Sequence, residues 1–131
     1  MKRKITQLIV EGKAVAFESL IYPDDGKDQF KLIIKSLGKY PDIVNRIINR
    51  LVVWSEQGIP PNTLKFRFER DHIFAIREEF VRIYGFFDTS RKFIIANGVI
   101  KKQNKANPTE LNKAVSFRNY YMEQVKKSWL R

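Results

Sequence analysis

Three lysines stand between an apolar run and a helix start in "FIIANGVIKKQNKANPTEL", Phe93 to Leu111. Lys101, Lys102 and Lys105 follow the apolar run, and "NPTE" comes directly after them. Cations grouped where a sheet edge meets a loop are well placed to hold the phosphates of a nucleic acid. A solvated surface loop has the same composition, so the lysines alone leave both interpretations open.

The charge of the whole chain favours a polyanionic partner. The net charge is +11, and residues 89–131 hold 10 lysines and arginines against 2 acidic residues, whereas residues 1–88 hold 15 against 12. Such a field attracts nucleic acid, a phosphate-rich membrane surface or an acidic protein. Aromatic residues (10 Phe, 5 Tyr, 2 Trp) lie among the cations, which favours nucleic acid over ordinary solubilising charge.

Composition excludes several classes of protein. The length of 131 residues, 44% of them hydrophobic, predicts one domain over residues 1–131. Cysteine is absent and His72 is the single histidine, which excludes thiolate chemistry and argues against a metal site. A Gly-rich phosphate loop and a nucleophile elbow are missing from the sequence, so we expect no cofactor. Without a spanning apolar run or a secretory signal, we expect a cytoplasmic protein that does not enter a membrane.

The first half of the chain predicts strands followed by helices. "AVAFESLIY", Ala14 to Tyr22, alternates like a strand, and "ITQLIV" is a plausible partner across a turn. Asp24 or Asp25 is expected to cap a short helix that ends at Gly38. A longer helix opens at Pro41 and carries one apolar stripe. Its arginines, Arg46 and Arg50, are expected on a solvated face.

The second half predicts a sheet and a closing helix. "TLKFRF", "HIFAIR", "FVRIYGFF" and "FIIANGVIK" are four successive short strands with tight connections, and "NPTE" opens the last helix. We therefore expect an α+β fold, in which an antiparallel meander of about four to five strands packs against N-terminal helices and a C-terminal helix.

The stretch from His72 to Ala114 resembles the second half of the HigB-like, phage-derived branch of the RelE/ParE toxin superfamily. That branch has a fixed order of segments. A strand ending in Leu-Arg is followed by a strand with Tyr-Arg-Ile/Val and by an apolar strand ending in His-Gly-Phe. A Lys-Lys pair and a polar loop then lead into a helix. The corresponding residues in this sequence are Ile76-Arg77, Val81-Arg82-Ile83, Asn97-Gly98-Val99, Lys101-Lys102 and Asn107-Pro108. The resemblance covers about a third of the chain and implies a RelE-like fold.

The resemblance implies a toxin of a type II toxin–antitoxin system that cleaves mRNA on the ribosome and is held inactive by a cognate, acidic antitoxin. Metal-independent cleavage of RNA needs a group that takes the proton of the 2′-hydroxyl, cations that stabilise the phosphorane, and an acid for the leaving oxygen. Arg77 and Arg82 suit the second task, because a guanidinium binds phosphate oxygens in a bidentate manner. Arg67, Lys102, Lys105 and Asn97 are expected to bind RNA.

The groups for proton transfer are less well defined in the sequence. Asn97 stands where the family often has histidine, and an amide is neither an acid nor a base near neutrality. Tyr84 and Lys101 are the alternatives, and Tyr84 shares strand parity with Arg82, so both project from the same face. Tyr84 is equally well interpreted as a core residue, and His72 as a structural one. Glu78 and Glu79 are adjacent carboxylates at a turn, where solvation is usual.

Two other functions also agree with the sequence. A phage-derived, non-catalytic module that binds nucleic acid or protein would keep the fold and the basic surface without the missing histidine. A gyrase poison, as on the ParE side of the superfamily, is the weaker alternative.

Overall fold

The computed structural model describes residues 4–22, 24–61, 64–89, 91–101 and 108–129. In this part of the chain, two strands, β1 (Thr6–Glu11) and β2 (Ala16–Leu20), precede the helices α1 (Gln29–Ser36) and α2 (Pro41–Gln57). Four strands and a helix follow: β3 (Phe66–Arg70), β4 (Ile73–Glu78), β5 (Val81–Thr89), β6 (Lys92–Ile100) and α3 (Pro108–Trp129). The α+β prediction and the closing helix are confirmed.

The sheet is mixed and has six strands in the order β1-β2-β6-β5-β4-β3. The expected antiparallel meander is present as β3 to β6, but β2 pairs with β6 in parallel. The prediction of a purely antiparallel sheet of four to five strands is therefore wrong. A parallel pair needs a long connection, and here both helices and three strands separate β2 from β6.

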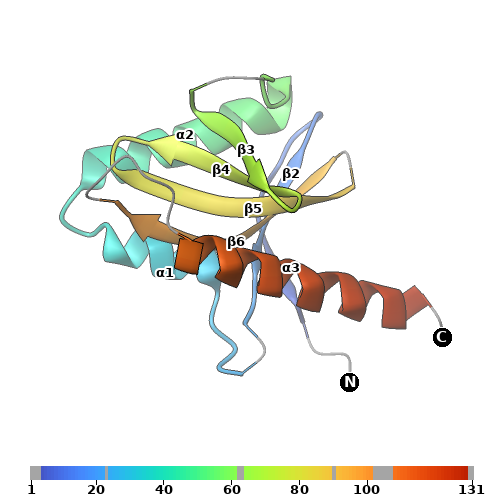
Figure 1. Cartoon of the computed structure of the whole chain (residues 1–131). Helices are drawn as coiled ribbons and strands as arrows, with labels where there is room; N and C mark the ends of the chain where they lie inside the picture. Colours follow the sequence, from blue (N-terminus) through green and yellow to red (C-terminus); the bar gives the residue numbers. More distant parts are fainter. Residues whose placement is uncertain (1–3, 23, 62–63, 90, 102–107, 130–131) are drawn as a thin grey trace.

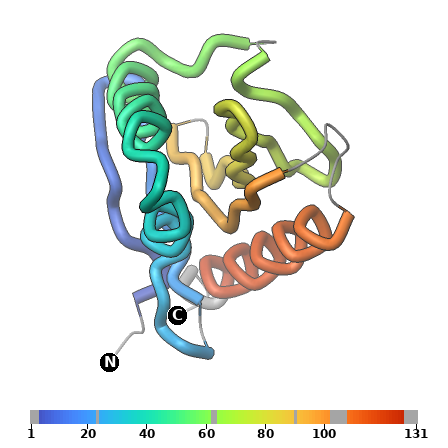
Figure 2. Tube along the Cα trace, turned by 90° about the vertical axis from the view of Figure 1, so that its left-hand side faces the viewer, coloured from blue at the N-terminus to red at the C-terminus, as the bar shows by residue number. Residues whose placement is uncertain are grey.

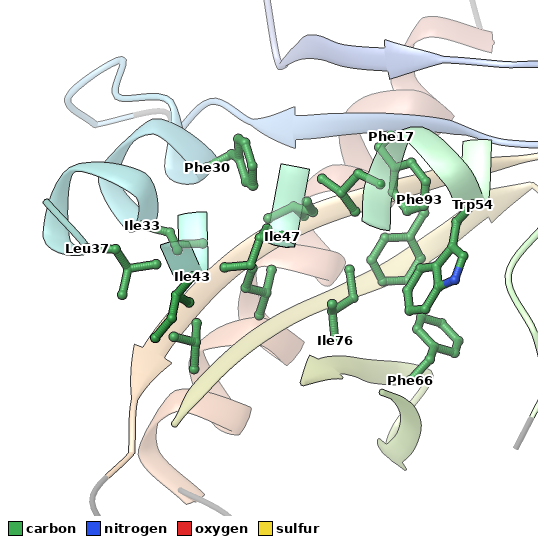
Figure 3. Close-up of a cluster of buried hydrophobic side chains, with 14 of the residues drawn as sticks. Phe17, Phe30, Ile33, Leu37, Ile43, Ile47, Trp54, Phe66, Ile76 and Phe93 are labelled. Atoms are coloured by element: carbon green, nitrogen blue, oxygen red, sulfur yellow. The ribbon is translucent and has the colours of Figure 1, made fainter. Parts of the chain in front are cut away.

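The helices cover the two faces of the sheet separately (Figures 1 and 2). α1 and α2 pack on one face around Phe17, Ile47, Phe66 and Phe93, whose side chains meet in one apolar cluster (Figure 3). α3 packs on the other face through Leu111, Ala114, Phe117 and Tyr121. Alternate residues of the central strands consequently point to different helices.

Local signals explain where the first helices begin and end. Asp28 caps α1, because its carboxylate accepts a hydrogen bond from the backbone N–H of Lys31 at 3.0 Å. The expected caps Asp24 and Asp25 lie before a turn at Gly26, whose φ is +68°, so that part of the prediction is wrong. In α2 the inner stripe includes Ile43, Ile47, Leu51 and Trp54.

The hairpin turns correct two further expectations. Asp71 and His72 both have positive φ and form the β3–β4 turn, so β4 begins at Ile73 and not at His72. At the β4–β5 turn Glu79 is exposed as expected, but Glu78 is only 3% exposed. The buried Glu78 carboxylate faces α2, where it forms ion pairs with Arg46, Arg50 and Lys65. Arg50 is therefore not on a freely solvated face.

Candidate nucleic-acid interface

Four cations from four segments gather on the α3 face of the sheet. We call Arg67, Arg77, Arg82 and Lys101 the cation cluster. Arg77 and Arg82 are directly opposite each other on β4 and β5, and Arg67 is opposite Ala75, the β4 residue two positions before Arg77. Ala75 and Tyr84 belong to the core beneath α3, so strand alternation places Arg77 and Arg82 on that same face. The expected shared face of Arg82 and Tyr84 is confirmed.

Arg82 is the buried member of the cluster, with 7% of its surface exposed. Its Nη1 donates hydrogen bonds to the backbone carbonyls of Glu79, at 2.7 Å, and of Val81, at 2.9 Å. Both acceptors lie in or beside the β4–β5 turn. The guanidinium is thus held by backbone oxygens, which carry no net charge, so these contacts do not cancel its positive charge.

The electrostatics confirm that these cations are close together. Burial lowers the pKa of Arg82, and the charge of Arg77 lowers it further. Burial likewise lowers the pKa of Lys101, with Arg82 as the next cause. Among the ion pairs of residues 4–22, 24–61, 64–89, 91–101 and 108–129, none includes a member of the cation cluster. Like charges converge here without a carboxylate at ion-pair distance.

One carboxylate, Glu69 of β3, nevertheless acts on the cluster. It raises the pKa of both Arg82 and Lys101, against the larger effect of burial. Glu69 is half-buried and lies in the bulge between Phe68 and Arg70, where the register against β4 shifts. Its effect on Arg82 and Lys101 shows that its carboxylate is near the cluster. Its position two residues after Arg67 is the signal in the sequence that points to it.

The acidic residues of the β4–β5 turn do not neutralise Arg77 or Arg82. Glu78 points to the opposite face and pairs with cations from α2 and with Lys65, and Glu79 pairs with Arg46 at 3.0 Å. Neither carboxylate is therefore at ion-pair distance from Arg77 or Arg82.

Tyr84 and Asn97 lie on neighbouring strands as opposite residues, but both are buried. Tyr84 is 1% exposed within the core cluster that includes Leu111 and Ala114 of α3. While α3 stays in place, the Tyr84 phenol is shielded from a large substrate. Its interpretation as a core residue is the one that the burial favours.

Asn97 is attached to α3 and not exposed for RNA. Its Nδ2 donates to the backbone carbonyl of Glu110 at 3.0 Å and to the Glu110 carboxylate at 2.9 Å. A register shift next to this residue leaves Ala96 without an opposite partner on β5. The bulge and the two hydrogen bonds fix the start of α3 against the sheet, which is a positioning role for Asn97.

The other expected residues lie apart from the cation cluster or outside the described ranges. His72 is exposed at the β3–β4 turn, at the opposite end of β4 from Arg77. Lys102 and Lys105, expected to bind RNA, and Asn107, the expected cap, lie outside the described residues. Within those residues, no group of three or more histidine, cysteine or acidic side chains could hold a metal ion. Nor does any helix there have the length and apolarity to cross a membrane.

Chemically, the cation cluster can bind a phosphate group and stabilise additional negative charge on it. Glu69 can accept a proton, and Lys101, with its lowered pKa, can donate one.

A scan against protein-family models and a search of curated proteins found no match to this chain.

Proposed function

We propose that the protein binds the phosphate backbone of RNA at the cation cluster and is a RelE-like toxin that cleaves mRNA on the ribosome without a metal ion. The observation that carries the proposal is the convergence of four cations around the buried Arg82, none of which forms an ion pair with another described residue. Gathering like charges costs folding free energy, and a bound phosphate would offset that cost. The family resemblance supplies the rest of the proposal, including a cognate acidic antitoxin.

One or more side chains of the site can be assigned to each step of the cleavage reaction. Glu69 takes the proton from the 2′-hydroxyl, whose oxygen then attacks the adjacent phosphorus. Arg77 and Arg82 stabilise the additional negative charge of the phosphorane. Lys101 donates a proton to the leaving 5′-oxygen, a role that its lowered pKa favours. The products are a cyclic phosphate and a 5′-hydroxyl.

A second candidate is an RNA-binding module without catalysis. The burial of Tyr84 and the attachment of Asn97 to α3 favour it, because two of the groups expected at the reaction centre are withdrawn from solvent. The module would use the same cation cluster, so a binding measurement does not distinguish the two functions. A cleavage assay does distinguish them, because only the toxin cuts RNA.

Primer extension on mRNA in a cell-free translation reaction tests the toxin function. We expect new 5′ ends with the wild-type protein only when ribosomes are present, and none with Arg77→Ala/Arg82→Ala. The matched control is Lys31→Ala/Lys35→Ala, which removes the same charge from exposed positions of α1 on the opposite side of the sheet. This control should cleave like the wild type.

Uncut mRNA beside an active control toxin would contradict the nuclease function. If the wild-type protein then still binds RNA and the double arginine variant does not, the binding module is the function of the cluster. Intact mRNA with induction of the DNA-damage response in cells would instead favour the weaker alternative, a gyrase poison.

A further inference from the structure

A second surface feature lies along the edge strand β3, on the face of the sheet that carries α1 and α2. It is a groove of ≈ 640 Å³ between β3 and the segment that follows α2, lined among others by Pro60, Leu64, Arg67, Phe68 and Phe74. Among the described residues that line the groove, Arg67 is the only charged one. Leu64 is 80% exposed and Phe68 60% exposed. Large apolar side chains gathered at an open surface are typical of a binding site.

The aromatic rings of the groove are held in fixed positions. The rings of Phe66 and Phe74 stack at 5.1 Å with an interplanar angle of 11°. Phe68 meets Phe74 edge-on at 5.4 Å, which leaves much of the Phe68 ring open to solvent. Phe66 is in turn packed against Trp54 and Phe93 in the core (Figure 3). The exposed ring therefore stands on a rigid support and loses little entropy when it binds a ligand.

Arg67 joins the groove to the cation cluster. It lines the groove and also lies close enough to Arg82 for its charge to help lower the pKa of Arg82. The aromatic rings of the groove face the α2 side of the sheet and the cation cluster faces the α3 side, so Arg67 on the edge strand β3 is the cluster cation that a ligand in the groove reaches directly. A nucleotide has the flat apolar part and the anionic group that suit aromatic rings beside one arginine.

A polypeptide fits the same surface less well. β3 is the last strand of the sheet, where another strand could in principle add. However, it is only five residues long, carries Arg67 and Arg70, and shifts register against β4 between Phe68 and Arg70. Charges and bulges on an edge strand oppose strand addition. A second copy of this chain would also bring a net charge of +11 against the same charge.

We propose that the groove accepts an unstacked base of single-stranded RNA, which stacks on Phe68 while its phosphate is held by Arg67 and the RNA strand continues over the edge of the sheet to the rest of the cation cluster. The inference rests on the proposed RNA binding and adds the substrate class, RNA whose bases are free to leave the helix. Stacking on an aromatic ring tolerates any base, so we expect little sequence preference at this position.

The test compares Phe68→Ala and Phe68→Tyr for binding to a fluorescent single-stranded RNA of about 10 nucleotides, a typical site size for such proteins. Phe68→Ala should weaken binding roughly ten-fold, the usual effect of losing one stacked base. Phe68→Tyr, which keeps the ring, should bind like the wild type. Leu8→Ala, at a 49% exposed position on the other edge strand, is the matched control and should have no effect. Thermal unfolding confirms that each variant is folded.

A set of RNAs with one base removed at each position in turn makes the test specific. At the position that occupies the groove, wild type and Phe68→Ala should bind equally, because neither can stack. Equal affinity of the two proteins for intact RNA would overturn the inference, and so would a loss that no abasic position removes. In that case, weaker RNA binding by the Arg77→Ala/Arg82→Ala variant would show that the phosphate site exists although the base site does not. No binding of RNA by the wild type would overturn both.

Discussion

The side chain of Arg82 illustrates how the surrounding residues keep a cation available. Its hydrogen bonds go to the carbonyls of Glu79 and Val81, while the carboxylates of Glu78 and Glu79 bind cations on the other face of the sheet. An arginine in an ion pair would have to exchange its partner before it could bind phosphate. Arg82 has no such partner among the described residues, so its charge can be directed at a ligand.

Glu69→Gln should separate cleavage from binding. The substitution removes the proposed general base, so we expect the cleavage rate to fall by about 10²- to 10⁴-fold, the usual contribution of such a group. RNA affinity should stay equal or increase, because a negative charge that acts on Arg82 and Lys101 is removed. Single-turnover cleavage and equilibrium binding are measured on the same RNA. Glu56→Gln, at an exposed position of α2, is the control for loss of one carboxylate and should leave both unchanged.

Cleavage by Glu69→Gln at the wild-type rate would exclude Glu69 as the base. Lower affinity with unchanged cleavage would assign Glu69 to RNA binding or to the position of Arg67. Only a loss of rate with retained affinity agrees with the proposed chemistry.

At the level of elements, α2 fixes the turn from which Arg82 is held. Arg50 donates to the backbone carbonyl of Arg77 at 3.3 Å and pairs with Glu78, and Arg46 reaches both Glu78 and Glu79. Arg82 takes a hydrogen-bond acceptor, the Glu79 carbonyl, from the same turn. Helix α2 on one face of the sheet thereby helps to position Arg82 on the other face.

Glu78→Gln and Glu79→Gln should therefore differ in stability although the residues are adjacent. Glu78 is 3% exposed, and its loss leaves Arg50 without its carboxylate; we expect a decrease of about 2 kcal/mol in the free energy of unfolding, below the usual 3–5 because Arg50 and Arg46 reach solvent. Glu79 is 54% exposed, and an exposed ion pair contributes less than about 1 kcal/mol. Chemical denaturation measures both. Equal small decreases would contradict the role of Glu78 in fixing the turn.

How much of these elements the sequence could predict depends on the range of the interactions. The meander from β3 to β6 and the start of α3 were predictable, because alternation and capping are local. The parallel pairing of β2 with β6 was not, because it joins residues more than 70 positions apart. The burial of Tyr84 likewise depends on where α3 docks, which strand parity alone does not reveal.

At the scale of the whole molecule, the positive site is not where the linear charge distribution suggested. The sequence places most of the excess charge in residues 89–131, yet three of the four cluster cations, Arg67, Arg77 and Arg82, come from the nearly balanced first part. The sheet brings them together because β3, β4 and β5 are neighbours. Strand pairing, and not local composition, makes this concentration of charge.

The salt dependence of RNA binding measures how many of these charges are used. Each phosphate of a single strand that is neutralised contributes about −0.7 to the slope of log K against log salt. With the scissile phosphate held by Arg77, Arg82 and Lys101 and a second phosphate held by Arg67, we expect a slope of about −1.4. Arg77→Ala/Arg82→Ala should bring it to about −0.7, because the scissile phosphate is no longer neutralised. Lys31→Ala/Lys35→Ala, with the same net charge, should keep the wild-type slope, because α1 lies across the sheet from the cluster. Equal slopes for the two variants would mean that total charge and not the cation cluster binds the RNA.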